Sequence, residues 1–195
     1  MKIVIVGCGG LGSTLAIKLI MYKKELRELV LIDNDIFEKD NILCEPFATG
    51  PVDLYINQPK SLVIAHTLRQ ITNKKIYTEV EFFTKNKLRK YKEYIKIDCR
   101  DNKITDSNFD YKLTMDGAFA LINTMPDDSH EDIQTNYTLQ KSYTYIEKLS
   151  FIFSFFIGKD YFKKGKYIIN LLEGEIINVT NTNERIRIPV SFTTS

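Results

Sequence analysis

The fold is decided by one stretch near the start of the chain, Lys2-Ile3-Val4-Ile5-Val6-Gly7-Cys8-Gly9-Gly10-Leu11-Gly12. Ile3 to Val6 is a continuous β-branched run, which is typical of a strand buried on both faces. The glycines that follow match G-x-G-x-x-G, and residues 13–22 then carry an apolar stripe at helical spacing. Glycines permit a tight turn, and the free amides at a helix start attract phosphate. The stretch therefore predicts a nucleotide-binding loop and leaves NAD, FAD and ATP open.

Further strands and helices alternate after this loop. Leu29 to Ile32 is a second buried strand that ends in Asp33, where a carboxylate can accept hydrogen bonds from a ribose hydroxyl. The apolar spacing predicts a helix over 60–71 and a short basic helix over 87–94, and strands over 75–83 and 95–99. This order predicts an α/β fold with a Rossmann-like, mainly parallel sheet flanked by helices.

The second half of the chain reads differently. Asp116-Gly117 between two apolar runs is a strong hairpin signal. Patterns for one helix and four strands follow, at 130–139, 150–157, 166–172, 175–179 and 185–192, with Glu173-Gly174 as a turn. We expect residues 1–110 to form a nucleotide-binding core and residues 111–195 to form a β-rich continuation of the same domain.

Composition restricts the functional class. The 195 residues are 44% hydrophobic and 27% charged, with a formal net charge of +2, too small to indicate nucleic-acid binding by bulk electrostatics. The longest apolar run, residues 149–157, falls far short of the roughly 20 residues of a membrane-spanning helix. Three cysteines without a Cys-x-x-Cys pair indicate neither a disulfide framework nor a structural zinc. Since the chain opens directly with a strand and no signal sequence, we expect a cytoplasmic protein without nucleic-acid or membrane partners.

Four motifs that follow in order narrow the choice among NAD, FAD and ATP. After the glycine loop come Asp33-Asn34-Asp35, Asn41-Ile42-Leu43, Gln58-Pro59-Lys60-Ser61 and Asp98-Cys99-Arg100-Asp101-Asn102. This set resembles the ThiF/MoeB/HesA superfamily, which includes the ubiquitin-activating enzymes, over about the first half of the chain. A plain dehydrogenase has no need for the Pro-Lys or Asp-Asn motif.

The resemblance implies a set of site residues for ATP and Mg²⁺. Asp33 holds the ribose, Asn41 lies beside the phosphates, and Lys60 neutralises triphosphate charge at a helix start. Asp101 binds the magnesium ion, and Asp101 and Lys60 are the implied catalytic residues. The full implied nucleotide-binding set is Gly7, Gly9, Gly10, Gly12, Asp33, Asp35, Asn41 and Lys60. Each polar residue also has a plain structural reading as a turn, cap or solvated helix-start residue.

The sequence departs from the superfamily pattern at two of its motifs. Cys44-Glu45 stands where members carry Arg-Gln, so a phosphate-binding guanidinium is missing and a carboxylate is added. No cysteine follows Cys99, so transfer of an acyl group to a thiol of this chain is not expected.

The resemblance implies an adenylyltransferase that activates the C-terminal carboxylate of a ubiquitin-like or sulfur-carrier protein, and a homodimer. Two alternatives stay open at this point. One is a catalytically degenerate scaffold that binds nucleotide and supports dimerisation, because of Cys44-Glu45. The other is an NAD- or FAD-dependent oxidoreductase, which rests on the glycine loop and Asp33 alone.

Overall fold

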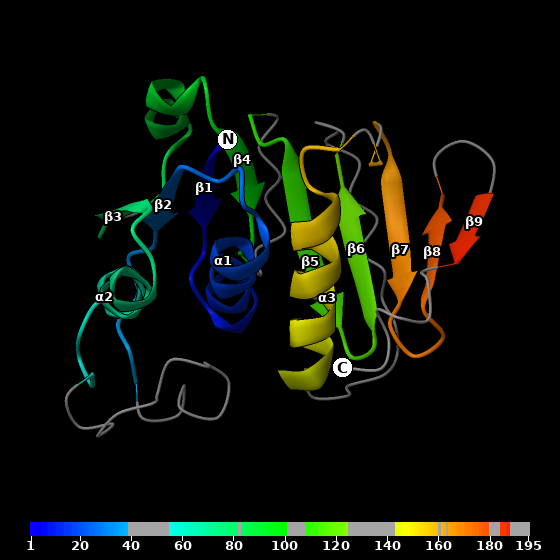
Figure 1. Cartoon of the computed structure of the whole chain (residues 1–195), viewed down its shortest axis with the longest axis horizontal. Coiled ribbons are helices and arrows are strands. Elements are labelled where there is room, and N and C mark those ends of the chain that lie inside the picture. Colours follow the sequence, from blue (N-terminus) through cyan, green and yellow to red (C-terminus); the bar gives the residue numbers. More distant parts are fainter. Residues whose placement is uncertain are drawn as a thin grey trace.

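The computed structural model describes residues 1–38, 55–81, 83–100, 108–124, 143–159, 161–162, 164–179 and 184–187. Within these residues one sheet of nine strands runs in the order β3-β2-β1-β4-β5-β6-β7-β8-β9, with helices packed on it (Figure 1). The α/β fold class predicted from the sequence is confirmed.

The first half of the sheet is parallel. Its strands are β1 (Lys2–Val6), β2 (Glu28–Ile32), β3 (Lys75–Glu79) and β4 (Ile95–Asp98). β1 lies between β2 and β4, with Ile3 opposite both Leu29 and Ile95. The chain therefore moves to one side of β1 for β2 and β3, and to the other side for β4, as in Rossmann-like folds.

The second half is antiparallel after the β4–β5 junction. Its strands are β5 (Tyr111–Asp116), β6 (Phe119–Asn123), β7 (Lys166–Asn170), β8 (Glu175–Asn178) and β9 (Glu184–Arg187). β4 and β5 pair in parallel, and every later pair is antiparallel. The predicted hairpin is confirmed, with Gly117 at φ 56° in its turn, and Gly174 at φ 68° lies in the predicted turn between β7 and β8.

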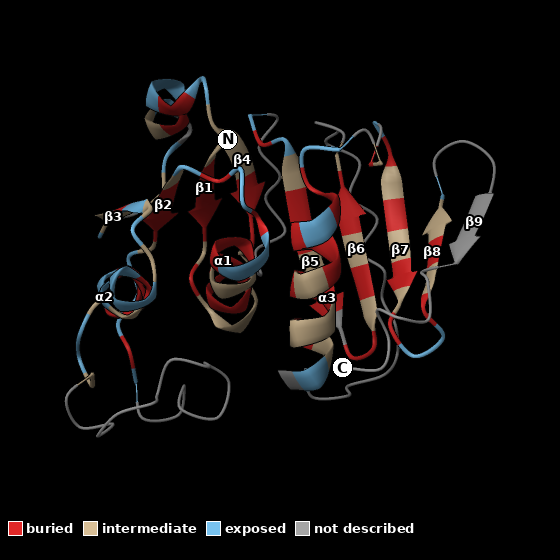
Figure 2. Cartoon of the chain, in the orientation of Figure 1, coloured by how far each residue is buried: buried red, intermediate tan, exposed pale blue. Residues whose placement is uncertain are grey.

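Three α-helices cover one face of the sheet, and a 3₁₀-helix covers part of the other. The α-helices are α1 (Gly10–Tyr22), α2 (Lys60–Ile71) and α3 (Tyr143–Phe156), and the 3₁₀-helix is η3 (Lys85–Tyr91). The α-helices share one apolar core with the sheet, whereas Leu88 and Tyr91 of η3 pack with Val4 and Val30 on the opposite face. Figure 2 shows that β1 and β2 are buried along most of their length.

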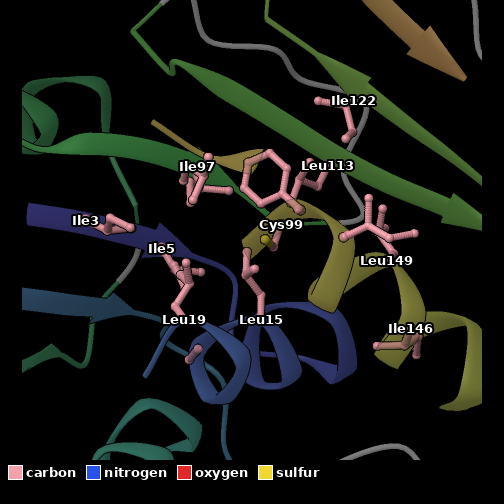
Figure 3. Packing of buried hydrophobic residues seen from close by; sticks show 14 of the residues in the cluster. Ile3, Ile5, Leu15, Leu19, Ile97, Cys99, Leu113, Ile122, Ile146 and Leu149 are labelled. Atoms are coloured by element: carbon pink, nitrogen blue, oxygen red, sulfur yellow. The ribbon is translucent and has the colours of Figure 1, made fainter. Parts of the chain in front are cut away.

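The strand predicted over 150–157 is wrong, because these residues belong to α3 and the turn after it. The run Ser150-Phe151-Ile152-Phe153-Ser154-Phe155-Phe156-Ile157 is almost wholly apolar, and period alone does not separate a buried helix from a buried strand. α3 packs along α1, and Ile146 and Leu149 join Leu15 in the core between helices and sheet (Figure 3). Burial on two sides explains why a helix carries so few polar residues there.

Other predicted boundaries shift slightly. The helix over 60–71 is confirmed, whereas β3 ends at Glu79 instead of residue 83. The short basic helix predicted over 87–94 is a 3₁₀-helix over 85–91. The predicted helix over 130–139 and residues 188–192 of the last predicted strand lie outside the described residues. Within the described part of the chain, no helix combines the length and apolar character needed to cross a membrane.

Candidate functional site

The glycine loop is held by close backbone packing. Gly7 donates its N–H to the carbonyl of Ile32 at 3.0 Å and has φ 91°, a conformation that favours glycine. A Cβ on Gly7 would lie 2.9 Å from the backbone nitrogen of Arg100, and a Cβ on Gly12 would lie 1.9 Å from the carbonyl oxygen of Gly7. Both glycines are therefore required for the strand, the loop and α1 to meet.

Gly9 differs from these two glycines. It precedes α1 with φ −69° and accepts a hydrogen bond from the Ser13 N–H at 2.9 Å. Apart from its own chain neighbours, a Cβ built on Gly9 meets no atom of the described residues within 4 Å. Packing within the described protein therefore does not explain this glycine, and the open space in front of it lies at a helix start, where backbone N–H groups favour an anion.

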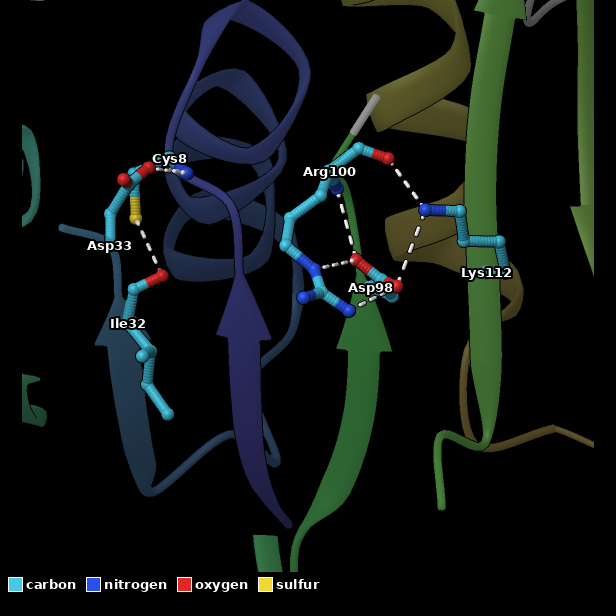
Figure 4. Close-up of polar contacts among 6 residues, drawn as sticks. All are labelled: Cys8, Ile32, Asp33, Asp98, Arg100 and Lys112. Carbon is cyan, nitrogen blue, oxygen red and sulfur yellow. Dashed lines mark hydrogen bonds and ion pairs between the residues drawn. The ribbon is translucent and has the colours of Figure 1, made fainter. Parts of the chain in front are cut away.

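Asp33 holds the loop from the end of β2. Its Oδ2 accepts the Cys8 N–H at 2.5 Å (Figure 4). Its Oδ1 accepts the Asp35 N–H at 2.8 Å. These two hydrogen bonds fix the carboxylate beside the glycine loop. The turn interpretation of Asp33 is thus compatible with a ligand role, because carboxylate oxygens accept more than one hydrogen bond each.

Lys60 is paired with Asp35. The Lys60 Nζ lies 2.6 Å from Asp35 Oδ2, and the Lys60 N–H donates to the Asp35 carbonyl at 2.9 Å. The Lys60 side chain is only 8% exposed, so it is not the solvated helix-start lysine of the structural reading. The pair joins the first turn of α2 to the loop after β2.

These residues line one pocket of about 250 Å³. Its walls come from the carboxyl ends of β1, β2 and β4, where a Rossmann-like sheet reverses its strand order and ligands characteristically bind. Of the residues implied by the resemblance, the pocket brings together Gly7, Gly9, Asp33, Asp35 and Lys60. Gly10 and Gly12 lie behind the loop in the first turn of α1.

A second charged cluster lies at the β4 end of the pocket. The Asp98 side chain is 1% exposed, and its Oδ1 and Oδ2 each lie 2.9 Å from an Arg100 guanidinium nitrogen. The Lys112 Nζ approaches Asp98 Oδ2 from β5 at 3.2 Å and donates to the Arg100 carbonyl at 2.5 Å. Figure 4 shows Asp98 between the two cations.

The guanidinium of Arg100 also stacks on an aromatic wall. Its carbon lies 4.3 Å from the centroid of the Phe83 ring and 5.6 Å from that of Phe109. Arg100, Phe83 and Glu81 all line the pocket, and Glu81 pairs with Lys87 at 2.6 Å. Sequence reasoning missed these three pocket residues. An arginine inside the Asp-Cys-x-Asp-Asn motif was the available signal for Arg100.

Two tyrosines connect η3 and the residues after it to the parallel strands. The Tyr94 hydroxyl donates to Glu28 at 2.6 Å, and this hydrogen bond raises the pKa of Tyr94 to about 12. The same contact lowers the pKa of Glu28 below its usual value. Tyr91 is hydrogen-bonded to Glu79, and burial together with this contact raises the pKa of Tyr91. These contacts attach η3 and the residues after it to β3 and β2.

Two implied site residues lie outside the described residues. These are Asn41 and Asp101, and the departure at Cys44-Glu45 also lies outside the described residues. Within the described ranges no group of three or more His, Cys, Asp or Glu residues gathers as a metal site. The magnesium role of Asp101 and the phosphate role of Asn41 therefore stay predictions.

The strand order and the glycine loop at the switch point define an α/β protein with a Rossmann-like ligand pocket. Residues 1–119 match the model of the ThiF family, and the chain belongs to this family. The resemblance inferred from the motifs is confirmed.

Solved structures with this fold include PaaA and E. coli MccB. PaaA is 18% identical with a TM-score of 0.64, over 96% of this chain and 64% of that chain. MccB solved with AMPCPP and MccA is 16% identical with a TM-score of 0.62, and MccB solved with ATP is 18% identical with a TM-score of 0.60; each match covers 97% of this chain and 65% of MccB. E. coli tRNA N6-threonylcarbamoyladenosine dehydratase, TcdA, in complex with ATP is 25% identical over 56% of this chain and 44% of that chain, with a TM-score of 0.47.

This chain thus spans less than two thirds of the length of each of these proteins. No curated protein sequence matches it.

Proposed function

We propose that the pocket binds ATP and that the chain transfers the adenylyl group of ATP to a carboxylate. The observation that carries this proposal is the open space in front of Gly9, beside a helix start and next to Asp33 and Lys60. Membership of the ThiF family supports it, and MccB, which shares the fold, has been solved with ATP.

The two ends of the pocket suit different parts of the nucleotide. Asp33 is fixed by two backbone N–H groups at the β2 end, where its remaining lone pairs can accept ribose hydroxyls. The backbone at Gly9 and the start of α1 receive the phosphates. Lys60 supplies positive charge from the start of α2, shared between Asp35 and the phosphates.

The reaction is an in-line displacement at the α-phosphorus. A carboxylate oxygen forms a bond to this phosphorus while the bond to the bridging oxygen of the β-phosphate breaks, giving an acyl-adenylate and pyrophosphate. Lys60 disperses charge on the phosphates as the bond breaks. Asp101 is proposed to hold the Mg²⁺ that shares this charge, with Asn41 beside the phosphates.

The substrate we propose is the C-terminal carboxylate of a ubiquitin-like or sulfur-carrier protein, and we propose a cytoplasmic homodimer. MccB, which shares this fold, has been solved with both AMPCPP and MccA, and this supports a second molecule as partner. In this arrangement residues 1–110 are the nucleotide-binding core, and residues 111–195 continue the same domain.

The proposal is tested by calorimetric titration of the full chain with Mg·ATP and with NAD⁺. ATP is expected to bind, and Gly9→Ala and Lys60→Met are expected to weaken binding about tenfold or more, through lost space and lost charge. Lys92→Ala removes an exposed lysine and is the matched control. Binding of NAD⁺ without ATP would instead support the oxidoreductase alternative.

Pyrophosphate exchange then separates an enzyme from a scaffold. Exchange of labelled pyrophosphate into ATP, dependent on a carrier protein and lost in Asp101→Ala, is the expected result. ATP binding without exchange for any carrier protein contradicts adenylation. That outcome favours the nucleotide-binding scaffold. The reason for this alternative is Cys44-Glu45 in place of Arg-Gln.

A further inference from the structure

Arg100 lines the same pocket, and the role inferred for it rests on the proposed nucleotide function. The pocket lining within the described residues includes two cations, Lys60 at the start of α2 and Arg100 after β4. Lys60 is 2.6 Å from Asp35 on the β2 side. The phosphates of ATP carry more charge than one lysine can balance, and the superfamily arginine is replaced by Cys44.

Arg100 begins directly against the glycine loop. A Cβ on Gly7 would lie 2.9 Å from both the backbone nitrogen and the Cγ of Arg100. The side chain therefore starts at the loop that faces the proposed phosphate position. It is 21% exposed, so the guanidinium has access to the pocket while most of its surface is covered.

The acidic groups around the pocket have donors or cations of their own. Asp33 accepts two backbone N–H groups, Asp35 pairs with Lys60, and Glu81 pairs with Lys87. Their negative charge is concentrated at the β2 and β3 side of the pocket. The β4 side is the end at which an anion meets a guanidinium.

Asp98 does not depend on Arg100 alone. Lys112 approaches the same carboxylate at 3.2 Å with a side chain that is 9% exposed. When the guanidinium turns toward the pocket, Asp98 retains a buried cation, so its charge is not left uncompensated. Phe83, 4.3 Å from the guanidinium, provides a flat surface along which it can rotate.

We propose that Arg100 is a phosphate-binding residue of this pocket, which exchanges its contact with Asp98 for a nucleotide phosphate while Lys112 keeps Asp98 paired. Arg100 thereby supplies, from the end of β4, the guanidinium that Cys44 lacks.

The experiment measures the affinities of the full chain and its variants for adenosine, AMP, ADP and ATP by calorimetry. Arg100→Ala is expected to weaken ATP binding about tenfold to a hundredfold and to change adenosine binding by less than about twofold. Arg100→Lys keeps the charge without the planar guanidinium, and its ATP affinity is expected to lie between those of the wild type and Arg100→Ala. Arg89→Ala, an exposed arginine of η3, is the matched control and is expected to bind all four ligands like the wild type.

The outcomes are distinguishable from those of the proposed function. Wild-type ATP affinity in Arg100→Ala, or an equal loss for adenosine and ATP, overturns the role of Arg100 while leaving ATP binding intact. If Arg100→Ala does not fold, wild-type ATP affinity in Arg100→Lys overturns the role in the same way. Failure of the wild type to bind ATP overturns both proposals, and this is seen before any variant is made. ATP binding without pyrophosphate exchange contradicts the proposed adenylation but not the phosphate-binding role of Arg100.

Discussion

The two halves of the sheet are buried to different extents. In β1 and β2 the first residue is half-buried and the next four are buried, whereas β7 alternates between half-buried and buried residues. The parallel strands are covered by α1 and α2 on one face and by η3 on the other. On β7 and β8, Ile168 and Ile177 point away from the helical core and are half-buried.

This difference shows why the pocket lies in the parallel half. Parallel strands end together at one edge of a sheet, so the loops after β1, β2 and β4 meet there. Antiparallel neighbours end alternately at opposite edges, which spreads their loops apart. The parallel half therefore gathers functional side chains, and the antiparallel half extends the core.

Glycine substitutions are expected to give the largest difference in lost stability between the two halves of the sheet. A methyl on Gly12 meets the Gly7 carbonyl oxygen at 1.9 Å, so Gly12→Ala should destabilise the protein by about 3 kcal/mol or more. Gly117→Ala places alanine at φ 56° in the hairpin and should cost about 1 kcal/mol. Urea unfolding measures both. Helix propensity alone predicts that Gly12→Ala stabilises α1 by about 1 kcal/mol, so a gain in stability would contradict the close packing.

Core truncations are expected to give the next largest contrast. Ile5 is fully buried in β1, and Ile5→Ala should lower the free energy of unfolding by about 3 kcal/mol. Ile168 in β7 is half-buried, and Ile168→Ala should cost about 1 kcal/mol. Equal losses in chemical unfolding would mean that the two halves are buried to the same extent in solution.

The smallest expected effect is the pH-dependent stabilisation by the hydrogen bond between Tyr94 and Glu28 of β2. Tyr94 donates to Glu28 at 2.6 Å, and its pKa in the folded protein, about 12, lies above the ordinary value of 10.0. The stabilisation is therefore fully present below pH 10 and is lost as the pH rises from 10 through 12. The stability difference between wild type and Tyr94→Phe should shrink between pH 9 and pH 12 in urea unfolding.

Tyr22→Phe, which removes the hydroxyl of an exposed tyrosine in α1, is the control for this measurement. A difference between wild type and Tyr94→Phe that is constant with pH would show that the Tyr94–Glu28 hydrogen bond does not form in solution.

Local patterns predicted most of the parallel half. Its strands are apolar runs, and its helices carry a stripe at helical spacing, so each residue type matches its own environment. α3 was missed because its environment is created by distant elements. Phe153 contacts Tyr111 of β5, and this partner is absent from any local window of sequence around α3. A helix covered by both sheet and neighbouring helix loses the polar face that identifies helices in sequence.

The candidate site was predictable to the extent that its motifs are local. The glycine loop, Asp33, Asp35 and Lys60 were named from short motifs, and the structure gathers them at one pocket. Arg100 and Phe83 enter the pocket because β4 pairs with β1 and because the segment before η3 folds over it. Such proximity depends on strand order, which no motif contains.

The strand order also sets a sequence of events for a chain that emerges from its amino terminus. β1 is synthesised first, but its second edge can pair only after β4 has been synthesised, because Ile3 lies opposite Ile95. β6 by contrast pairs with β5 through a two-residue connection, and β8 pairs with β7 through a four-residue connection. Long-range strand pairing is slow because the entropy cost of closing the loop comes before the stabilising contacts form. The pocket, which needs Gly7 against Arg100, therefore closes only after half the chain has been synthesised, and the remaining strands are then added to an existing edge one neighbour at a time.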